Sequence, residues 1–179
     1  APNTIVGGNA GQALTTGSSN ALLGYQAGYS LTNRSNCVYI GYDAGHTLDG
    51  AGNNVAIGKD AMKSAGTAAN NDAADNVAVG YQALIAITDG ANNVAVGSGA
   101  ADALTTGIQN VAIGRSALGS ADNDESYNVA IGSHAMATVD DDDADHNIAL
   151  GYYALNATTV AASVAIGRES LKANTTGEG

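Results

Sequence analysis

The chain has 179 residues and a formal net charge of −11, and it contains 24 glycines but one proline, no Phe and no Trp. So few large apolar side chains would fill a compact core poorly, whereas a thin structure only a few aliphatic side chains across suits this composition. The apolar runs are interrupted well before 18 residues, which excludes insertion into a membrane, and the acidity excludes a nucleic acid as partner.

One short motif recurs along the whole chain, and its glycine marks each copy. Neighbouring marker glycines are 16 to 22 residues apart, most often 17, and a fixed period of this kind is typical of repeat architecture. The sequence therefore predicts a single domain, residues 1–179, of about ten stacked coils. The marker glycines are Gly7, Gly24, Gly41, Gly58, Gly80, Gly97, Gly114, Gly132, Gly151 and Gly167.

The residues around each marker glycine predict one coil of a parallel β-solenoid, and hence an all-β fold. Positions three and one before the glycine are almost always aliphatic, as in Val55 and Ile57, which is typical of a short strand with one face in a core. The glycine marks a sharp bend. The stretch after it, such as "YQAL" or "RSAL", predicts a second short strand, followed by turn residues such as "LTTG".

A column of asparagines accompanies the strands. Asn stands four residues before the marker glycine in eight copies, and Cys37 and Ser163 replace it in the other two. Because neighbouring coils of a solenoid stack about 4.8 Å apart, we expect these side-chain amides to form a ladder, each bonded to the next coil or to a turn.

The repeats carry a family resemblance. The segments "NVAIGRSAL", "NVAIGSHAM" and "SVAIGRESL" resemble the head repeats of YadA-type trimeric autotransporter adhesins, and "NALLGYQAG" and "NVAVGYQAL" resemble the related repeats of phage tail fibres. The resemblance covers the whole chain and implies a left-handed β-roll, three chains around a common axis, and a role in attachment. These coils are longer than the usual adhesin repeat, which favours the phage-fibre variety.

The residue between the two aliphatic strand positions predicts how such chains associate. If the aliphatic residues on either side face the coil's own core, this middle residue faces outward. It is Ala in seven successive copies and a larger apolar residue in the first three, so we expect it to pack against the other chains of a homotrimer, with the larger residues widening the axis at the first coils. The expected interface is Ala56, Ala78, Ala95, Ala112, Ala130, Ala149, Ala165, Tyr39, Leu22 and Ile5.

Tyrosines recur at the position after the marker glycine, namely Tyr25, Tyr42, Tyr81 and Tyr152, and Tyr153 adjoins the last of them. This position is expected to face outward. Because aromatic side chains with a polar tip are favoured in surfaces that bind sugars and proteins, these residues are candidates for receptor contact. The alternative is that they only cover the flank of the rod.

Two enlarged turns, before Asn128 and Asn147, gather acidic residues. Oxygen-rich loops of this kind can hold a divalent cation, but the Asp-x-Asp-x-Asp-Gly order of a dedicated calcium loop is absent. We therefore expect solvated acidic loops and no cofactor, with Asp140, Asp141, Asp142, Asp143 and Asp145 as weak metal candidates. The longest insertion, residues 63–75, is expected to be a surface loop.

The sequence does not indicate an enzyme. His46, His134 and His146 lie in different coils, and no serine or acid stands at a spacing typical of nucleophilic catalysis. A polysaccharide hydrolase built on a right-handed β-helix would need acids in a groove along the coils, whereas here they are concentrated in turns.

The function expected is that of a segment of a longer extracellular attachment fibre, on a virion or a cell surface, which binds a cell-surface glycan or protein. One alternative is the head domain of a bacterial adhesin. Another is an architectural filament or sheath subunit that binds no receptor.

Overall fold

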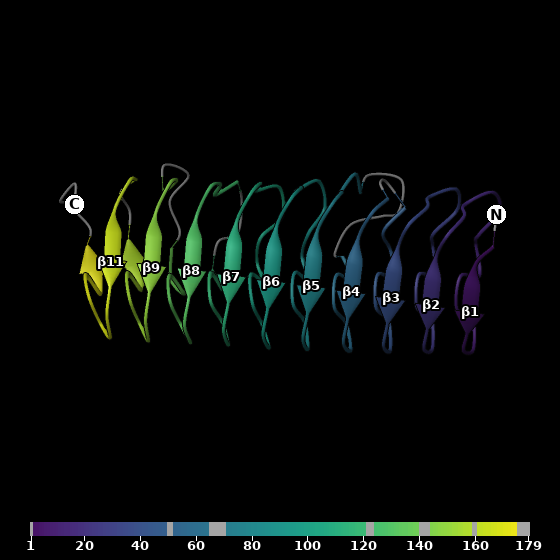
Figure 1. Ribbon diagram of the computed structural model, residues 1–179, viewed down its shortest axis with the longest axis horizontal. Helices are drawn as coiled ribbons and strands as arrows, with labels where there is room; N and C mark the ends of the chain where they lie inside the picture. Colours follow the sequence, from purple (N-terminus) through teal and green to yellow (C-terminus); the bar gives the residue numbers. More distant parts are fainter. Residues whose placement is uncertain are drawn as a thin grey trace.

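The computed structural model describes residues 2–49, 52–64, 71–120, 124–139, 144–158 and 161–174. They form a rod of stacked coils with the two chain ends at opposite ends of the rod (Figure 1). Each coil contributes one three-residue strand to a ten-stranded sheet whose order follows the sequence. The strands are β1 (Thr4–Val6), β2 (Ala21–Leu23), β3 (Val38–Ile40), β4 (Val55–Ile57), β5 (Val77–Val79), β6 (Val94–Val96), β7 (Val111–Ile113), β8 (Val129–Ile131), β9 (Ile148–Leu150) and β11 (Val164–Ile166).

All neighbouring strands of this sheet are parallel and in register. In β7 and β8, for example, Val111 pairs with Val129 and Ala112 with Ala130. The longest spacing, 22 residues between Gly58 and Gly80, does not shift the register of β4 and β5. The predicted parallel β-solenoid is confirmed, with about nine turns and a period of about 17 residues.

The marker glycines are fixed by backbone conformation and by space. Their φ angles lie between +118° and +139°, a region that side chains other than glycine's rarely enter. A Cβ on Gly114 would also lie 2.6 Å from the carbonyl oxygen of Gly132 in the next coil. The same clash recurs from Gly7 to Gly151, because the glycines stack directly on one another.

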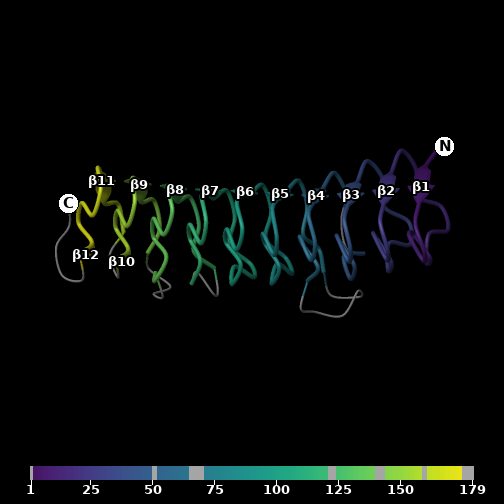
Figure 2. The ribbon, with the colours of Figure 1, turned by 90° about the horizontal axis from the view of Figure 1, so that it is seen from below.

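The segment after the glycine does not form the second strand that the sequence predicted. Residues two and four after the glycine have positive φ in every coil, as at Ser116 (49°) and Leu118 (53°), and such a backbone cannot extend as a strand. Its N–H groups still reach the adjoining coils: Ser116 N donates to Ser98 O at 3.0 Å. In the described residues a second strand pair occurs only between β10 (Ala157–Thr158) and β12 (Ala173–Asn174), on the side of the coils away from the ten-stranded sheet (Figure 2).

The asparagine ladder forms as predicted. The backbone N–H of Asn110 donates to Oδ1 of Asn93 at 2.9 Å, and Nδ2 of Asn93 donates to the carbonyl of Gly107 at 2.8 Å. These buried amides therefore join the start of the next strand to a corner of their own coil; at Asn147 the bond to the next strand is kept, but Nδ2 has no partner within the described residues. The substituted rung keeps part of this pattern, because Cys37 N donates to Oδ1 of Asn20 at 2.9 Å.

The core is thin and lies inside the coils, and the middle residue of each strand points into it. Ala112 is 1% exposed, whereas Ile113 beside it is 38% exposed. The prediction that the residues on either side of the middle residue face the core, and that the middle residue faces outward, was therefore wrong. The column Ala56, Ala78, Ala95, Ala112, Ala130, Ala149 and Ala165 is buried in the chain's own core, with Tyr39 and Leu22, so these residues cannot form the interface between chains; Ile5, in the first strand, is 41% exposed.

The physical reason is a match of sizes across the coil. Where the middle strand residue is large, the residue four after the glycine is Gly: a Cβ on Gly45 would lie 2.6 Å from the ring of Tyr39, and one on Gly28 would lie 3.0 Å from Leu22. Where the middle residue is Ala, that position usually holds a buried Leu or Met, such as Leu118. The core has room for one large side chain from these two positions.

The insertion at residues 63–75 is only partly the surface loop expected. Residues 65–70 lie outside the described residues. Asn71 and Ala73 are buried, and Asn71 Nδ2 donates to the carbonyl of Thr47 at 2.9 Å. The end of the insertion therefore packs onto the rod.

Candidate functional surfaces

The outward face of the ten-stranded sheet is almost entirely aliphatic, and we call it the aliphatic stripe. The alternation of the sequence predicts that this face is in the core, and the structure shows that it is not. Its residues are Val6, Ala21, Leu23, Val38, Ile40, Val55, Ile57, Val77, Val79, Val94, Val96, Val111, Ile113, Val129, Ile131, Ile148, Leu150, Val164 and Ile166.

The aliphatic stripe is continuous because the strands are in register. Its residues are half-buried or exposed in the single chain, and no charged residue interrupts it. It is roughly 43 Å long, since nine inter-strand spacings of about 4.8 Å separate its ends. Soluble monomers rarely expose a contiguous apolar patch of this extent, and such patches mark interaction surfaces.

The tyrosines after the marker glycines are exposed, as the sequence predicted. Tyr25, Tyr42, Tyr81 and Tyr152 are each 46–49% exposed. The rings of Tyr25 and Tyr42 stack with centroids 5.2 Å apart. Lys59 continues this row, with Nζ 5.8 Å from the ring of Tyr42 and 5.7 Å from that of Tyr81.

Tyr153 lies one position further along the chain and is half-buried. Its ring is edge-on to Tyr152 at 4.5 Å and stacks on His134 at 4.8 Å. The four exposed tyrosines and Tyr153 therefore belong to two neighbouring rows on one corner of the rod.

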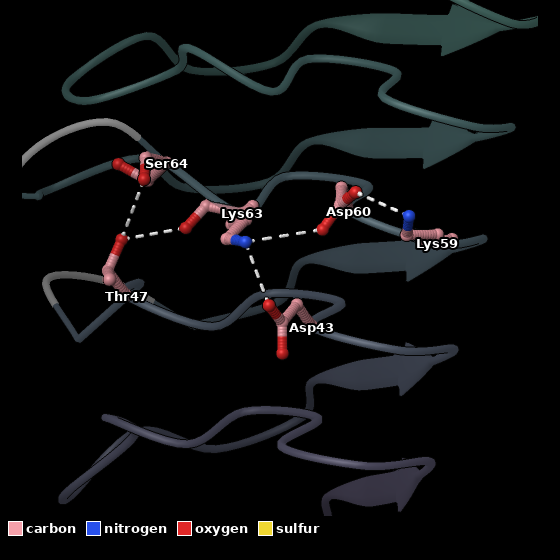
Figure 3. Close-up of polar contacts among 6 residues, drawn as sticks. All are labelled: Asp43, Thr47, Lys59, Asp60, Lys63 and Ser64. Carbon is pink, nitrogen blue, oxygen red and sulfur yellow. Dashed lines mark hydrogen bonds and ion pairs between the residues drawn. The ribbon is translucent and has the colours of Figure 1, made fainter.

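A group of charged residues fills the same corner in the coils of β3 and β4. Lys63 Nζ lies 2.8 Å from Oδ2 of Asp43 and 3.3 Å from Oδ1 of Asp60, and Lys59 lies 3.8 Å from Asp60 (Figure 3). Hydrogen bonds from Lys63 to the two aspartates raise the pKa of its ammonium group. Thr47 holds the backbone beside it by donating to the carbonyl of Lys63 at 2.7 Å. These carboxylates are neutralised and offer little to a ligand.

The acidic turns give no metal centre. Asp140, Asp141, Asp142 and Asp143 lie outside the described residues. Asp145 is described, and its Oδ1 accepts a hydrogen bond from the backbone N–H of Ser126 at 2.6 Å, so it links its coil to the neighbouring one. Within the described ranges, no three His, Cys, Asp or Glu side chains are grouped so that they could hold a metal ion.

Other predicted features also have structural partners. His46 stacks on Tyr29 at 4.9 Å and His146 on Tyr127 at 4.8 Å. Cys37 is buried, and this burial raises the pKa of its thiol. In the part of the chain that the structure describes, no helix is long and apolar enough to cross a membrane.

No protein-family model, curated protein or solved structure matches the chain significantly. The molecule is thus a parallel β-solenoid without a family assignment, and its function is argued from its own surfaces.

Proposed function

We propose that this chain is a segment of a homotrimeric attachment fibre of the phage tail-fibre kind, located outside the cell and without enzymatic activity. The observation that carries the proposal is the aliphatic stripe. A stripe along the whole rod fits association of parallel copies side by side, each copy repeating the same contacts at every coil. The number three comes from the resemblance of the repeats to those of trimeric fibre proteins.

Closed rotational symmetry accommodates this geometry. Rotation about an axis parallel to the rods lets each stripe face the same central line, so that every chain buries its apolar residues and no stripe is left open. The free energy of association gained is modest, about 0.8 kcal/mol for each CH₂ group removed from water, but the burial is repeated in every coil.

The exposed tyrosines support the attachment part of the proposal. They lie on the corner after the glycine and are not part of the aliphatic stripe, so they remain available when the stripes associate. An architectural filament without receptor binding differs from this proposal in one measurable respect: neither cells nor glycans would retain it.

The proposal is tested by placing charge on the stripe. Ile113→Lys with Ile131→Lys puts two ammonium groups at positions that are each 38% exposed in the single chain, so a lone rod can still fold. Sedimentation velocity should give a trimer for the parent and a monomer for the variant. Ser98→Lys with Asn33→Lys adds the same charge at exposed positions off the stripe and should leave the trimer intact.

A monomeric parent, or a stripe variant that remains trimeric, would overturn the assembly. For the attachment function, binding to host or target cells is measured for the parent and for a variant with four tyrosines replaced by Ser. These are Tyr25, Tyr42, Tyr81 and Tyr152. A folded trimer that binds no cell would support the architectural alternative instead.

A further inference from the structure

A groove opens on the corner after the marker glycines, across the coils of β6 to β9. It encloses about 280 Å³. Asp102 lies in the coil of β6, Ser116 and Gly119 follow in that of β7, and His134 and Tyr153 close the groove from the coils of β8 and β9. Four successive coils therefore contribute to one concave site.

The groove exists because small residues stand where other coils carry larger ones. The second position after the glycine is Gln26 or Gln82 in two other coils but Ser116 here. The fifth position is Gly119 and then Ala137. A depression is left between the larger side chains on either side.

One wall of the groove is an aromatic ring held in place. His134 stacks on Tyr153 with the ring planes 6° apart, and its Nδ1 lies 2.8 Å from Oγ of Ser133. The far side of Tyr153 is occupied by Lys172, whose Nζ is 5.1 Å from the ring. Because Tyr153 comes from the next coil, the second face of the imidazole is directed along the rod toward the coil of Ser116.

The opposite wall carries a carboxylate that is paired with no cation among the described residues. Asp102 is half-buried, and its one hydrogen bond within the described part of the chain comes from its own backbone N–H. Burial raises the pKa of this carboxyl group. At the corresponding corner of β3 and β4, by contrast, Asp43 and Asp60 are both paired with Lys63, and Asp60 also with Lys59 (Figure 3).

We propose that this groove binds one hexopyranose residue of a surface glycan, with Asp102 accepting hydrogen bonds from two neighbouring sugar hydroxyls and the C–H face of the sugar against the imidazole of His134. Two carboxylate oxygens match a vicinal diol, and a fixed ring face suits the apolar side of a sugar. The hydroxyls of Ser116 and Ser120 add partners that can donate or accept, and that of Thr138, which donates to the carbonyl of Asn156 at 2.7 Å, can still accept. This site deepens the proposed attachment function, on which it rests, by naming the receptor class.

The groove does not have the arrangement of a nucleophilic catalyst. In the described residues no hydrogen bond joins Ser116 to His134, whose Nδ1 contacts Ser133 instead. An organic cation is the competing ligand, because Asp102 is the single carboxylate among the lining residues that the structure describes. The hydroxyl groups on this wall favour the sugar, since they can donate hydrogen bonds to sugar oxygens, whereas a cation accepts none.

The test is saturation-transfer NMR on the full chain with methyl α-glucopyranoside, methyl α-mannopyranoside, methyl β-galactopyranoside and propylammonium as probes. At least one glycoside should show transfer to its ring protons, with a dissociation constant of about 1 mM, a weak affinity typical of one small contact surface. Asp102→Asn and Ser116→Gln should each weaken it at least tenfold.

Ser116→Gln fills the groove with a residue that the same position carries, at positive φ, in Gln26 and Gln82. The matched control is Asp75→Asn, which removes an exposed carboxylate at a position where Asn36, Asn53 and Asn92 stand in other coils. The control should bind the glycoside as the parent does, and thermal melts of all variants should show one folded species.

Absence of transfer to every glycoside would overturn the proposal, as would a signal that both groove variants leave unchanged. A signal from propylammonium alone, lost in Asp102→Asn, would identify a cation site instead. Failure here differs from failure of the fibre: an intact trimer that binds no glycoside loses only the groove, and a monomer that binds one loses only the fibre.

Discussion

At the scale of single residues, the stacked glycines meet a conformational and a steric requirement together. Gly114→Ala should lower the free energy of unfolding by about 2–6 kcal/mol, from roughly 1–3 kcal/mol of backbone strain and a similar cost of overpacking. Thermal and urea denaturation measure the loss.

Gly167 provides the matched control for that substitution. It shares the positive φ, at +118°, but a Cβ there would meet nothing within 4 Å. Gly167→Ala should therefore cost only the strain. Equal losses at both positions would show that the contact between glycines is unimportant.

The burial of Asp102 predicts how the stability of the chain depends on pH. Its folded-state pKa is raised by burial, so ionisation costs stability as the pH rises from the ordinary aspartate pKa through the folded value, and that cost persists at neutral pH. Asp102→Asn should therefore unfold at a higher temperature than the parent at pH 7, and the difference should shrink on acidification. A variant less stable than the parent at pH 7 would contradict this reading, and Asp75→Asn shows the effect of losing an exposed carboxylate.

At the scale of the coil, the size match across the core predicts a compensating pair. Ala112→Leu alone should overpack the coil and destabilise it by about 1–3 kcal/mol. Adding Leu118→Gly reproduces the pairing seen at Leu22 and Gly28, and Leu118 already has φ of +53°, so the double variant should recover part of the loss. A double-mutant cycle of urea denaturation curves measures the coupling.

The prediction would be contradicted if the double variant lost as much free energy of unfolding as the two single variants together. The single variant Leu118→Gly serves as the control, since it removes a fully buried side chain and should be destabilising by itself.

The period of the sequence was sufficient to predict the coils, the strand before each marker glycine and the asparagine ladder, because each depends on one motif repeated at one spacing. The sequence did not predict correctly which face of the strands points into the core. Alternation of Val55, Ala56 and Ile57 distinguishes two faces but does not say which is inside, and the larger residues were assigned to the core. The pairing of Tyr39 with Gly45, and of alanine with Leu or Met elsewhere, is the signal in the sequence that identifies the inner face.

Other features depended on information that the motif does not carry. The left-handed residues after the glycine include Leu118 and Met136, residue types that give no sign of positive φ. The exposure of the tyrosines was predicted because their column varies freely. The groove was missed because Asp102 stands at a different position of its coil from Ser116 and His134, and the three residues, which belong to three coils, meet only after the coils stack.

At the scale of the whole molecule, the charge of the chain acts against the proposed association. A net charge of −11 on each chain repels its copies over the screening length, which falls from about 10 Å at 0.1 M salt to about 3 Å at 1 M. The proposed trimer should therefore melt at a higher temperature as NaCl rises over this range. Calorimetry at constant protein concentration measures the shift, with the monomeric stripe variant as the comparison; a trimer that melts lower in salt would indicate that ion pairs between chains dominate.

The in-register stacking of identical strands has a consequence for how such a molecule changes length. Since every coil ends directly beneath its own beginning, a whole repeat can be inserted or deleted and the contacts of all the others keep their partners. The rod grows or shrinks in graduations of about 4.8 Å, and each graduation brings one more residue to the corner after the glycine. The number of repeats thereby sets the length of the rod and the number of receptor contacts along it. Single substitutions set the chemistry of each contact.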